Sequence, residues 1–154
     1  MLDRIDRRIL STLQENCRQS MAELAETVGL SPSACHRRVG LLESAGLIDG
    51  YVAALNQKAL GYGIAFFAEL TLNAQSEDAL EDFERAVTRI PEVVECHLMA
   101  GQADYLVKVV AVDTADYERI HRHYLSRLPH VTRIHSSLVL RPVKRWAGIP
   151  VPSS

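Results

Sequence analysis

The sequence predicts an α+β protein: an N-terminal winged helix-turn-helix plus a C-terminal ferredoxin-like βαββαβ domain. Helix-capping signals are closely spaced in the first fifty residues. The remainder alternates strand-like and helix-like segments, and its 154-residue length suits two small domains. We expect a helix-turn-helix at 1–50, a wing strand and linker at 51–63, and the βαββαβ domain at 64–154.

Two short helices are expected first. Asp3 can cap a helix whose apolar positions recur with the helical period, and these are Ile5, Ile9, Leu10 and Leu13. Ser20 and Glu23 have the spacing of a capping box, which predicts the start of a second helix. Gly29 is expected to end that helix, because glycine adopts the left-handed conformation that closes many helices.

A third helix should begin at Pro32 with Ser31 as its cap, and Gly46 should close it. Its inward positions are Cys35, Val39 and Leu42. Two helices joined by a glycine-containing turn form a helix-turn-helix, whose last helix enters the major groove of DNA. The alternative to a DNA-binding motif is an ordinary three-helix packing unit whose arginines are only solvated.

Each outward position has a chemical role on DNA. Ala34 can contact a thymine methyl group, and Arg37 can make a bidentate contact with guanine. His36 can reach a base or a phosphate, whereas Arg38 binds phosphate or braces the fold. Amides at the Ser31 cap can hold a phosphate. The expected DNA-binding residues are Ser31, Ser33, Ala34, His36, Arg37 and Arg38.

The second part of the chain is expected to form a wing, then a connector, and then alternating strands and helices. Asp49 and Gly50 predict a hairpin, hence a two-stranded wing at 47–55, and 56–63 should connect the domains. Strands are expected at 64–72, 93–100, 104–112 and 131–143, with helices at 76–90 and 114–128. The inward helix residues should be Leu80, Phe83, Val87, Ile90, Tyr117, Ile120, Tyr124 and Leu128.

Both helices should cover one face of an antiparallel sheet. The opposite face mixes apolar side chains with Glu69 and Lys108, which we expect to pair across adjacent strands. A face exposed to solvent would be more polar, so we interpret it as a homodimer interface.

Composition excludes several classes of protein. The net charge of −2 does not indicate a polyanion partner, so a DNA hypothesis rests on where charges lie. No apolar run would span a membrane, and the N-terminus lacks a signal-peptide core, so we expect a cytoplasmic protein. The three cysteines favour reduced, buried thiols. We expect no cofactor, because catalytic motifs are missing, and no metal, because His121 and His123 lie on different helix faces.

The chain resembles the Lrp/AsnC (leucine-responsive regulatory protein) family of transcription regulators over residues 2–144. The segments that carry the resemblance are LDRIDRRIL, LAETVGLSPSACHRRVGLLESAGLIDGY and ECHLMAGQADYLVKV. The resemblance implies DNA binding, an amino-acid effector, homodimers and often a ring of four dimers, an octamer. Two departures are Gly40-Leu41, where the family often has basic residues, and Gln102, where its Gly-Asp-x-Asp turn has an acid.

An amino-acid effector would need partners for both of its charges. Asp104 can accept from the ammonium, and the amides of Gly101 and Gln102 can donate to the carboxylate. Leu98 and Val139 can supply an apolar wall. The family resemblance implies that Leu98, Asp104, Ser137 and Val139 govern the effector response, in a pocket between dimers. The alternative is that Gly101 only serves a hairpin and Asp104 caps a strand.

Two other functions remain open from the sequence. Some relatives of this fold are sirohaem decarboxylases, which the chain resembles in architecture, although the intact recognition helix favours DNA. The other is an assembly module that has lost DNA binding.

Overall fold

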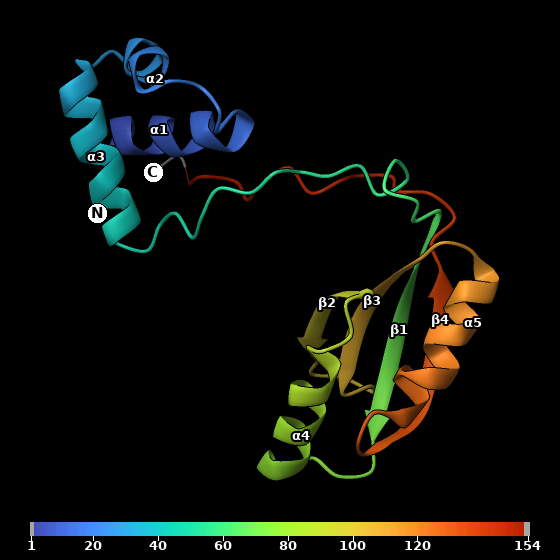
Figure 1. Ribbon diagram of the computed structural model, residues 1–154. Helices are drawn as coiled ribbons and strands as arrows, with labels where there is room; N and C mark the ends of the chain where they lie inside the picture. The colour runs from blue at the N-terminus through green and yellow to red at the C-terminus, as the bar shows by residue number, and fades with distance from the viewer. Residues whose placement is uncertain (1, 153–154) are drawn as a thin grey trace. The chain divides into compact units, whose positions relative to one another are not determined.

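The computed structural model describes residues 2–152, which form two compact units (Figure 1). One unit contains the residues up to Ala54 together with those from Val143, and the other is Leu55–Pro142. The bounds that the sequence suggested at residues 50 and 63 stay predictions.

The first unit consists of three helices, α1 (Arg4–Glu15), α2 (Met21–Val28) and α3 (Pro32–Ser44). The capping signals operate as expected. Ser20 and Glu23 form the capping box, and Ser31 Oγ accepts from the Ala34 amide at 3.3 Å. Gly29 closes α2 at φ +76°, a conformation that favours glycine. The apolar sides of the helices form one core: Ile9, Leu24, Ala25, Val28, Cys35, Val39 and Leu42.

The two-stranded hairpin expected for the wing is not formed, and residues 46–63 contain no strand. A two-residue hairpin of the Asp-Gly type needs positive φ at both central residues, and Gly50 lacks it. An isolated pair of short strands is also marginal in water. Val52 and Leu55 are consequently 87% and 71% exposed.

Residues 143–152 belong to the first unit, although they were expected in the last domain. The Gln14 carboxamide on α1 holds this segment by two hydrogen bonds to Ile149. Its Nε2 donates to the Ile149 carbonyl at 2.9 Å, and its Oε1 accepts from the Ile149 amide at 2.8 Å. The segment comes close to α1 at Gly148, where a Cβ would overlap the Gln14 side chain.

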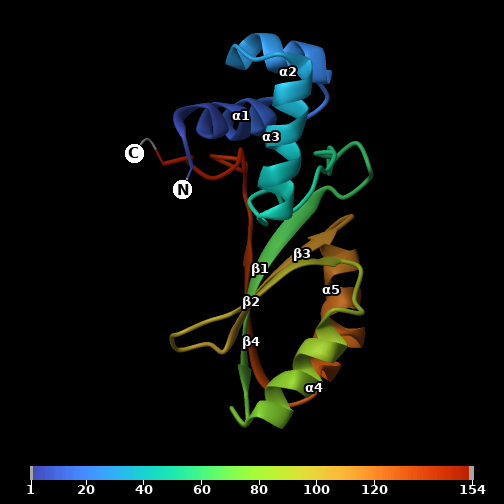
Figure 2. The same cartoon turned by 90° about the vertical axis from the view of Figure 1, so that its left-hand side faces the viewer.

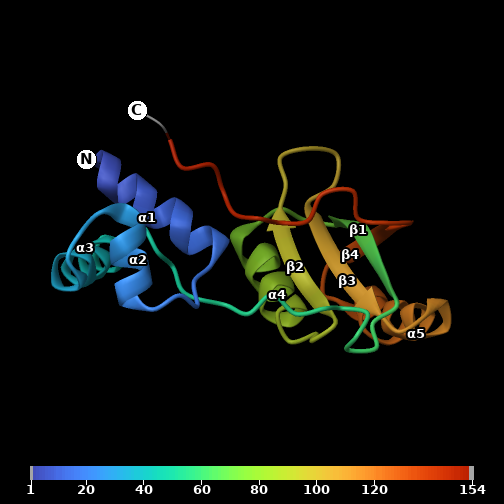
Figure 3. The same ribbon diagram turned by 90° about the horizontal axis from the view of Figure 1, so that it is seen from above.

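The second unit has the predicted βαββαβ order. It contains β1 (Ile64–Leu72), α4 (Glu77–Val87), β2 (Val93–Leu98), β3 (Tyr105–Ala111), α5 (Thr114–His123) and β4 (Val131–Leu138). The sheet order is β2-β3-β1-β4, and all neighbouring strands are antiparallel. Both helices lie on one side of the sheet, and the β2–β3 loop projects on the other (Figures 2 and 3).

The core of this unit lies between the helices and the sheet. Phe83 of α4 packs on Tyr105 of β3 with ring centroids 4.2 Å apart, and Phe66 of β1 stacks on Tyr117 of α5 at 3.6 Å. Tyr124 was expected inward but is 42% exposed. The α-helix ends at His123 and a short 3-10 helix follows, so Leu125 enters the core instead.

The cysteines differ from one another in burial, and all three are free thiols. Cys35 is buried in the first unit and Cys96 is half-buried, but Cys17 is exposed. The expectation that all are buried was therefore wrong for Cys17, which lies just beyond the end of α1.

Candidate DNA-binding and ligand-binding sites

Helix α3 has one buried and one exposed side. Ser33, His36 and Arg37 are exposed, Ala34 is half-buried, and the inward residues belong to the core. Ser31 is exposed at the helix start, where its hydroxyl lies 3.3 Å from that of Ser33. The small residues thus lie in the first turn, and the His36–Arg37 pair follows on the exposed side.

Arg38 differs from the other candidates because it is held by the protein. Its Nη1 lies 2.6 Å from Asp3 Oδ2 and 2.7 Å from Asp6 Oδ1, so α3 is tied to the start of α1. The Asp6 amide and the Arg38 guanidinium lower the pKa of Asp3, and these carboxylates raise the pKa of Arg38. Of the two roles that the sequence left open, these contacts support bracing.

The sheet face opposite the helices, the open face, carries side chains from all four strands. Phe67, Glu69 and Thr71 of β1 point there, because the alternate residues of this strand are buried under the helices. The expected pairing of Glu69 with Lys108 is not formed. Lys108 is paired with Glu95 of β2 at 2.7 Å and lowers the pKa of that carboxyl.

The β2–β3 loop is held at its base by Asp104, which is only 7% exposed. One Asp104 oxygen accepts from the Leu72 amide at 2.7 Å, and the other accepts from Gln75 Nε2 at 2.6 Å. Both oxygens are therefore engaged by the protein. Gly101 does not have positive φ, and a Cβ there would meet open space, so the turn does not depend on glycine.

The expected effector-binding residues do not converge within one chain. Leu98 ends β2, whereas Ser137 lies on β4 at the opposite edge of the sheet. Three strand spacings separate those edges, about 14 Å. Val139 lies beyond the end of β4, where its amide donates to the Ala65 carbonyl at 2.9 Å. A pocket that contains Leu98 and Val139 together would therefore need more than one chain.

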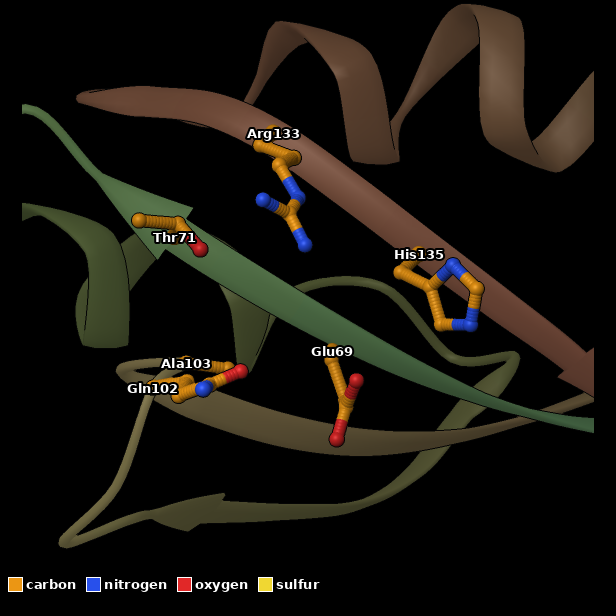
Figure 4. A pocket seen from close by; sticks show the side chains of 6 residues that line it. All are labelled: Glu69, Thr71, Gln102, Ala103, Arg133 and His135. Atoms are coloured by element: carbon orange, nitrogen blue, oxygen red, sulfur yellow. The ribbon is translucent and has the colours of Figure 1, made fainter.

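One polar pocket of about 400 Å³ lies on the open face (Figure 4). Its floor comes from β1 and β4, where Glu69 is paired with His135 and Thr71 with Arg133. A β-bulge follows at Thr71–Leu72. Its wall is the β2–β3 loop, through Gln102 and Ala103. Gln102 is the one expected effector residue that lines this pocket.

Sequence reasoning missed Thr71, Arg133 and His135 and used Glu69 only as an interface charge. Arg133 and His135 alternate along VTRIHSS, as residues on one sheet face do. That alternation, combined with the pairing of the first and last strands in the predicted fold, was the signal that could have identified them.

Residues 2–152 contain no group of three or more histidine, cysteine or acidic residues placed to hold a metal ion. Over the same residues, no helix is long and apolar enough to cross a membrane.

Two family models match the chain. Residues 2–49 match the model described as winged helix-turn-helix DNA-binding, and residues 65–148 match that of the Lrp/AsnC ligand binding domain. The leucine-responsive regulatory protein of Escherichia coli (strain K12) is 43% identical over 144 residues, which cover 94% of this chain and 88% of that protein.

Solved structures of regulators share the whole fold. A transcriptional regulator from Neisseria meningitidis, in complex with L-Met, is 35% identical with a TM-score of 0.92, and 97% of each chain is covered. An AsnC family transcriptional regulator from Agrobacterium tumefaciens is 32% identical with a TM-score of 0.91, again over 97% of each chain. These relatives are named as regulators, and nothing in the comparisons supports a sirohaem decarboxylase.

Arg38→Ala should lower the Tm of the protein, because it removes the contacts between α3 and the start of α1. The pKa of Asp3 is depressed in the fold, so its contribution is present above its ordinary pKa of about 3.9 and is lost as pH falls through the lower folded value. Thermal unfolding should therefore show a gap between wild type and variant at pH 7 that narrows in acid. Arg37→Ala is the control, and an equal Tm loss there would contradict the brace.

Asp104→Ala should lower the free energy of unfolding by about 1–3 kcal/mol, because the Leu72 amide loses its buried acceptor. Urea unfolding measures this. Asp78→Ala, at an exposed position on α4, is the control. Unchanged stability would show that the carboxylate does not hold the loop base.

Proposed function

The chain belongs to the Lrp/AsnC family of DNA-binding transcriptional regulators and is not an enzyme, and from this premise we propose how its two units work. The exposed side of α3 contacts DNA, and the second unit binds a free amino acid and a second copy of the chain. The protein acts in the cytoplasm, where its DNA is.

The exposed side of α3 is the observation that carries the DNA proposal. Its small residues precede His36 and Arg37, so bases can approach the first turn closely while the longer side chains reach further along the groove. Ser31 and the amides at the cap hold a phosphate. Arg38 acts mainly through Asp3 and Asp6, by fixing the helix that carries the other contacts.

The open face supports a homodimer. Phe67, at the centre of the open face, is 37% exposed and lies beside the Lys108–Glu95 pair. An exposed aromatic among paired charges suits a self-complementary interface between identical copies. Two recognition helices related by a twofold axis would read a roughly palindromic site, with half-sites about 10 base pairs or a multiple apart.

The amino-acid effector is supported by the matched ligand-binding domain and by the L-Met complex of the Neisseria meningitidis regulator. Leu98, Ser137 and Val139 lie too far apart to surround one ligand in a single chain, which favours contacts between dimers and an octamer of four dimers. Effector binding would favour one assembly over another and so change the placement of the DNA-binding units.

Arg37→Ala should weaken binding to a specific DNA site by about 1–3 kcal/mol and relax base preference at one position, while the Tm stays unchanged. Footprinting and binding isotherms at fixed salt measure this. Arg8→Ala, an exposed arginine on α1, is the control and should leave base preference intact. An unchanged footprint for Arg37→Ala would show that this residue does not read bases.

Phe67→Asp should convert the dimer to a monomer, because it places a carboxylate where the second copy must pack. Analytical ultracentrifugation measures the mass. Leu140→Asp is the control, since Leu140 is 91% exposed beyond the end of β4. A dimer that survives Phe67→Asp would exclude the open face as the interface.

A further inference from the structure

The first unit contains a small pocket of its own, with a volume of about 240 Å³. Its lining comes from the end of α1, the loop after it, the start of α2, one side of α3 and Tyr51. The apolar side chains of Leu13, Leu24 and Val39 form its inner part, because all three are buried or half-buried. The volume lies below the range of drug-sized sites, about 300–1,000 Å³, so the pocket suits a small ligand.

Gly40 leaves the space that this pocket occupies. It lies in the interior of α3, where glycine is a weak helix former. It does not have positive φ, and a Cβ there would meet no neighbouring atom within 4 Å. Neither the backbone conformation nor the packing of the unit therefore requires glycine. Because His36, Gly40 and Glu43 share one side of α3, the missing side chain opens a space between the other two.

Glu43 gives the pocket its charge. Among the described residues that line it, Glu43 is the one acid, and there is no lysine or arginine. One Glu43 oxygen accepts from the Tyr51 hydroxyl at 2.9 Å, which leaves the other oxygen for a ligand. Partial burial and this carboxylate raise the pKa of Tyr51 to about 12, so the hydroxyl stays a donor at neutral pH. A carboxylate without a basic partner in the lining favours a cationic ligand.

We propose that this pocket binds a small apolar amine, with the ammonium on Glu43 and the apolar body over Gly40. The exposed part of the Tyr51 ring can add a cation–π contact. The inference goes beyond the proposed function, because it places a second kind of ligand in the DNA-binding unit. A free amino acid suits this pocket poorly, since its carboxylate would lie near Glu43 and find no basic side chain in the lining.

His36 connects the pocket to DNA binding. It lines the pocket, and it is one of the exposed α3 residues for which we propose a DNA contact. A ligand against its ring restricts where the imidazole can reach, so the amine and DNA compete. Linkage requires DNA to weaken amine binding by the same factor. This competition rests on the proposed function, whereas the binding of the amine does not.

An NMR titration of the full chain with phenethylamine tests the site, with the ring signals of His36 and Tyr51 as the readout. Phenethyl alcohol has the same number of non-hydrogen atoms and no charge, so it should bind roughly three- to tenfold more weakly. Glu43→Gln should weaken amine binding by a similar factor and abolish the difference between the two probes. Glu26→Gln, at an exposed position on α2, is the matched control and should bind as wild type does.

Gly40→Leu tests the space itself. The leucine side chain occupies the volume that the ligand needs, so both probes should bind roughly tenfold more weakly or worse. The Tm should not fall, because leucine is a better helix former than glycine and meets no neighbour at its Cβ. Ala22→Leu, at an exposed position on α2 outside the pocket, is the control and should leave the binding of both probes unchanged.

DNA-binding isotherms test the competition, with phenethylamine replaced by NaCl of equal ionic strength in the reference. The amine should raise the Kd for DNA in wild type and not in Gly40→Leu. An equal Kd for DNA with and without the amine in wild type would overturn the competition. The pocket assignment is overturned if wild type does not bind the amine, or if Glu43→Gln and Gly40→Leu bind it as wild type does. The Arg37→Ala footprint tests DNA recognition separately from either result.

Discussion

The alternation of side chains along β1 is the constraint on which the second unit depends. Phe66, Ala68, Leu70 and Leu72 lie under the helices, so the intervening residues must face the other way. A slip of one residue would exchange the two sets and place Glu69 in the core. The packing that stabilises the domain therefore also fixes Phe67 and Glu69 on the face where we propose dimer contacts.

Features settled by local chemistry could be predicted from the sequence. The Ser20–Glu23 box and the Ser31–Pro32 start involve groups within three residues of each other, so their outcome hardly depends on the rest of the fold. The two-stranded hairpin expected at 47–55 is not formed, because a hairpin is stable only when its strands have something to pair with and pack on. Tyr124 was wrong because helical periodicity ceases to apply where α5 becomes a 3-10 helix.

The polar pocket was harder to predict, because its residues meet only through long-range pairing. Thr71 and Arg133 are far apart in the sequence and become neighbours when β4 pairs with β1. Asp104 stays a predicted effector-binding residue. Within the chain its carboxylate accepts from the Leu72 amide and from Gln75, which come from the end of β1 and the loop after it. A single acid cannot reveal such donors until the strands are in register.

The location of the polar pocket constrains assembly. A second copy that covers the open face would remove Glu69 and Arg133 from water, which is costly for charges without partners. The interface must therefore either supply a partner of opposite charge to each of these side chains or leave both in contact with water at its edge.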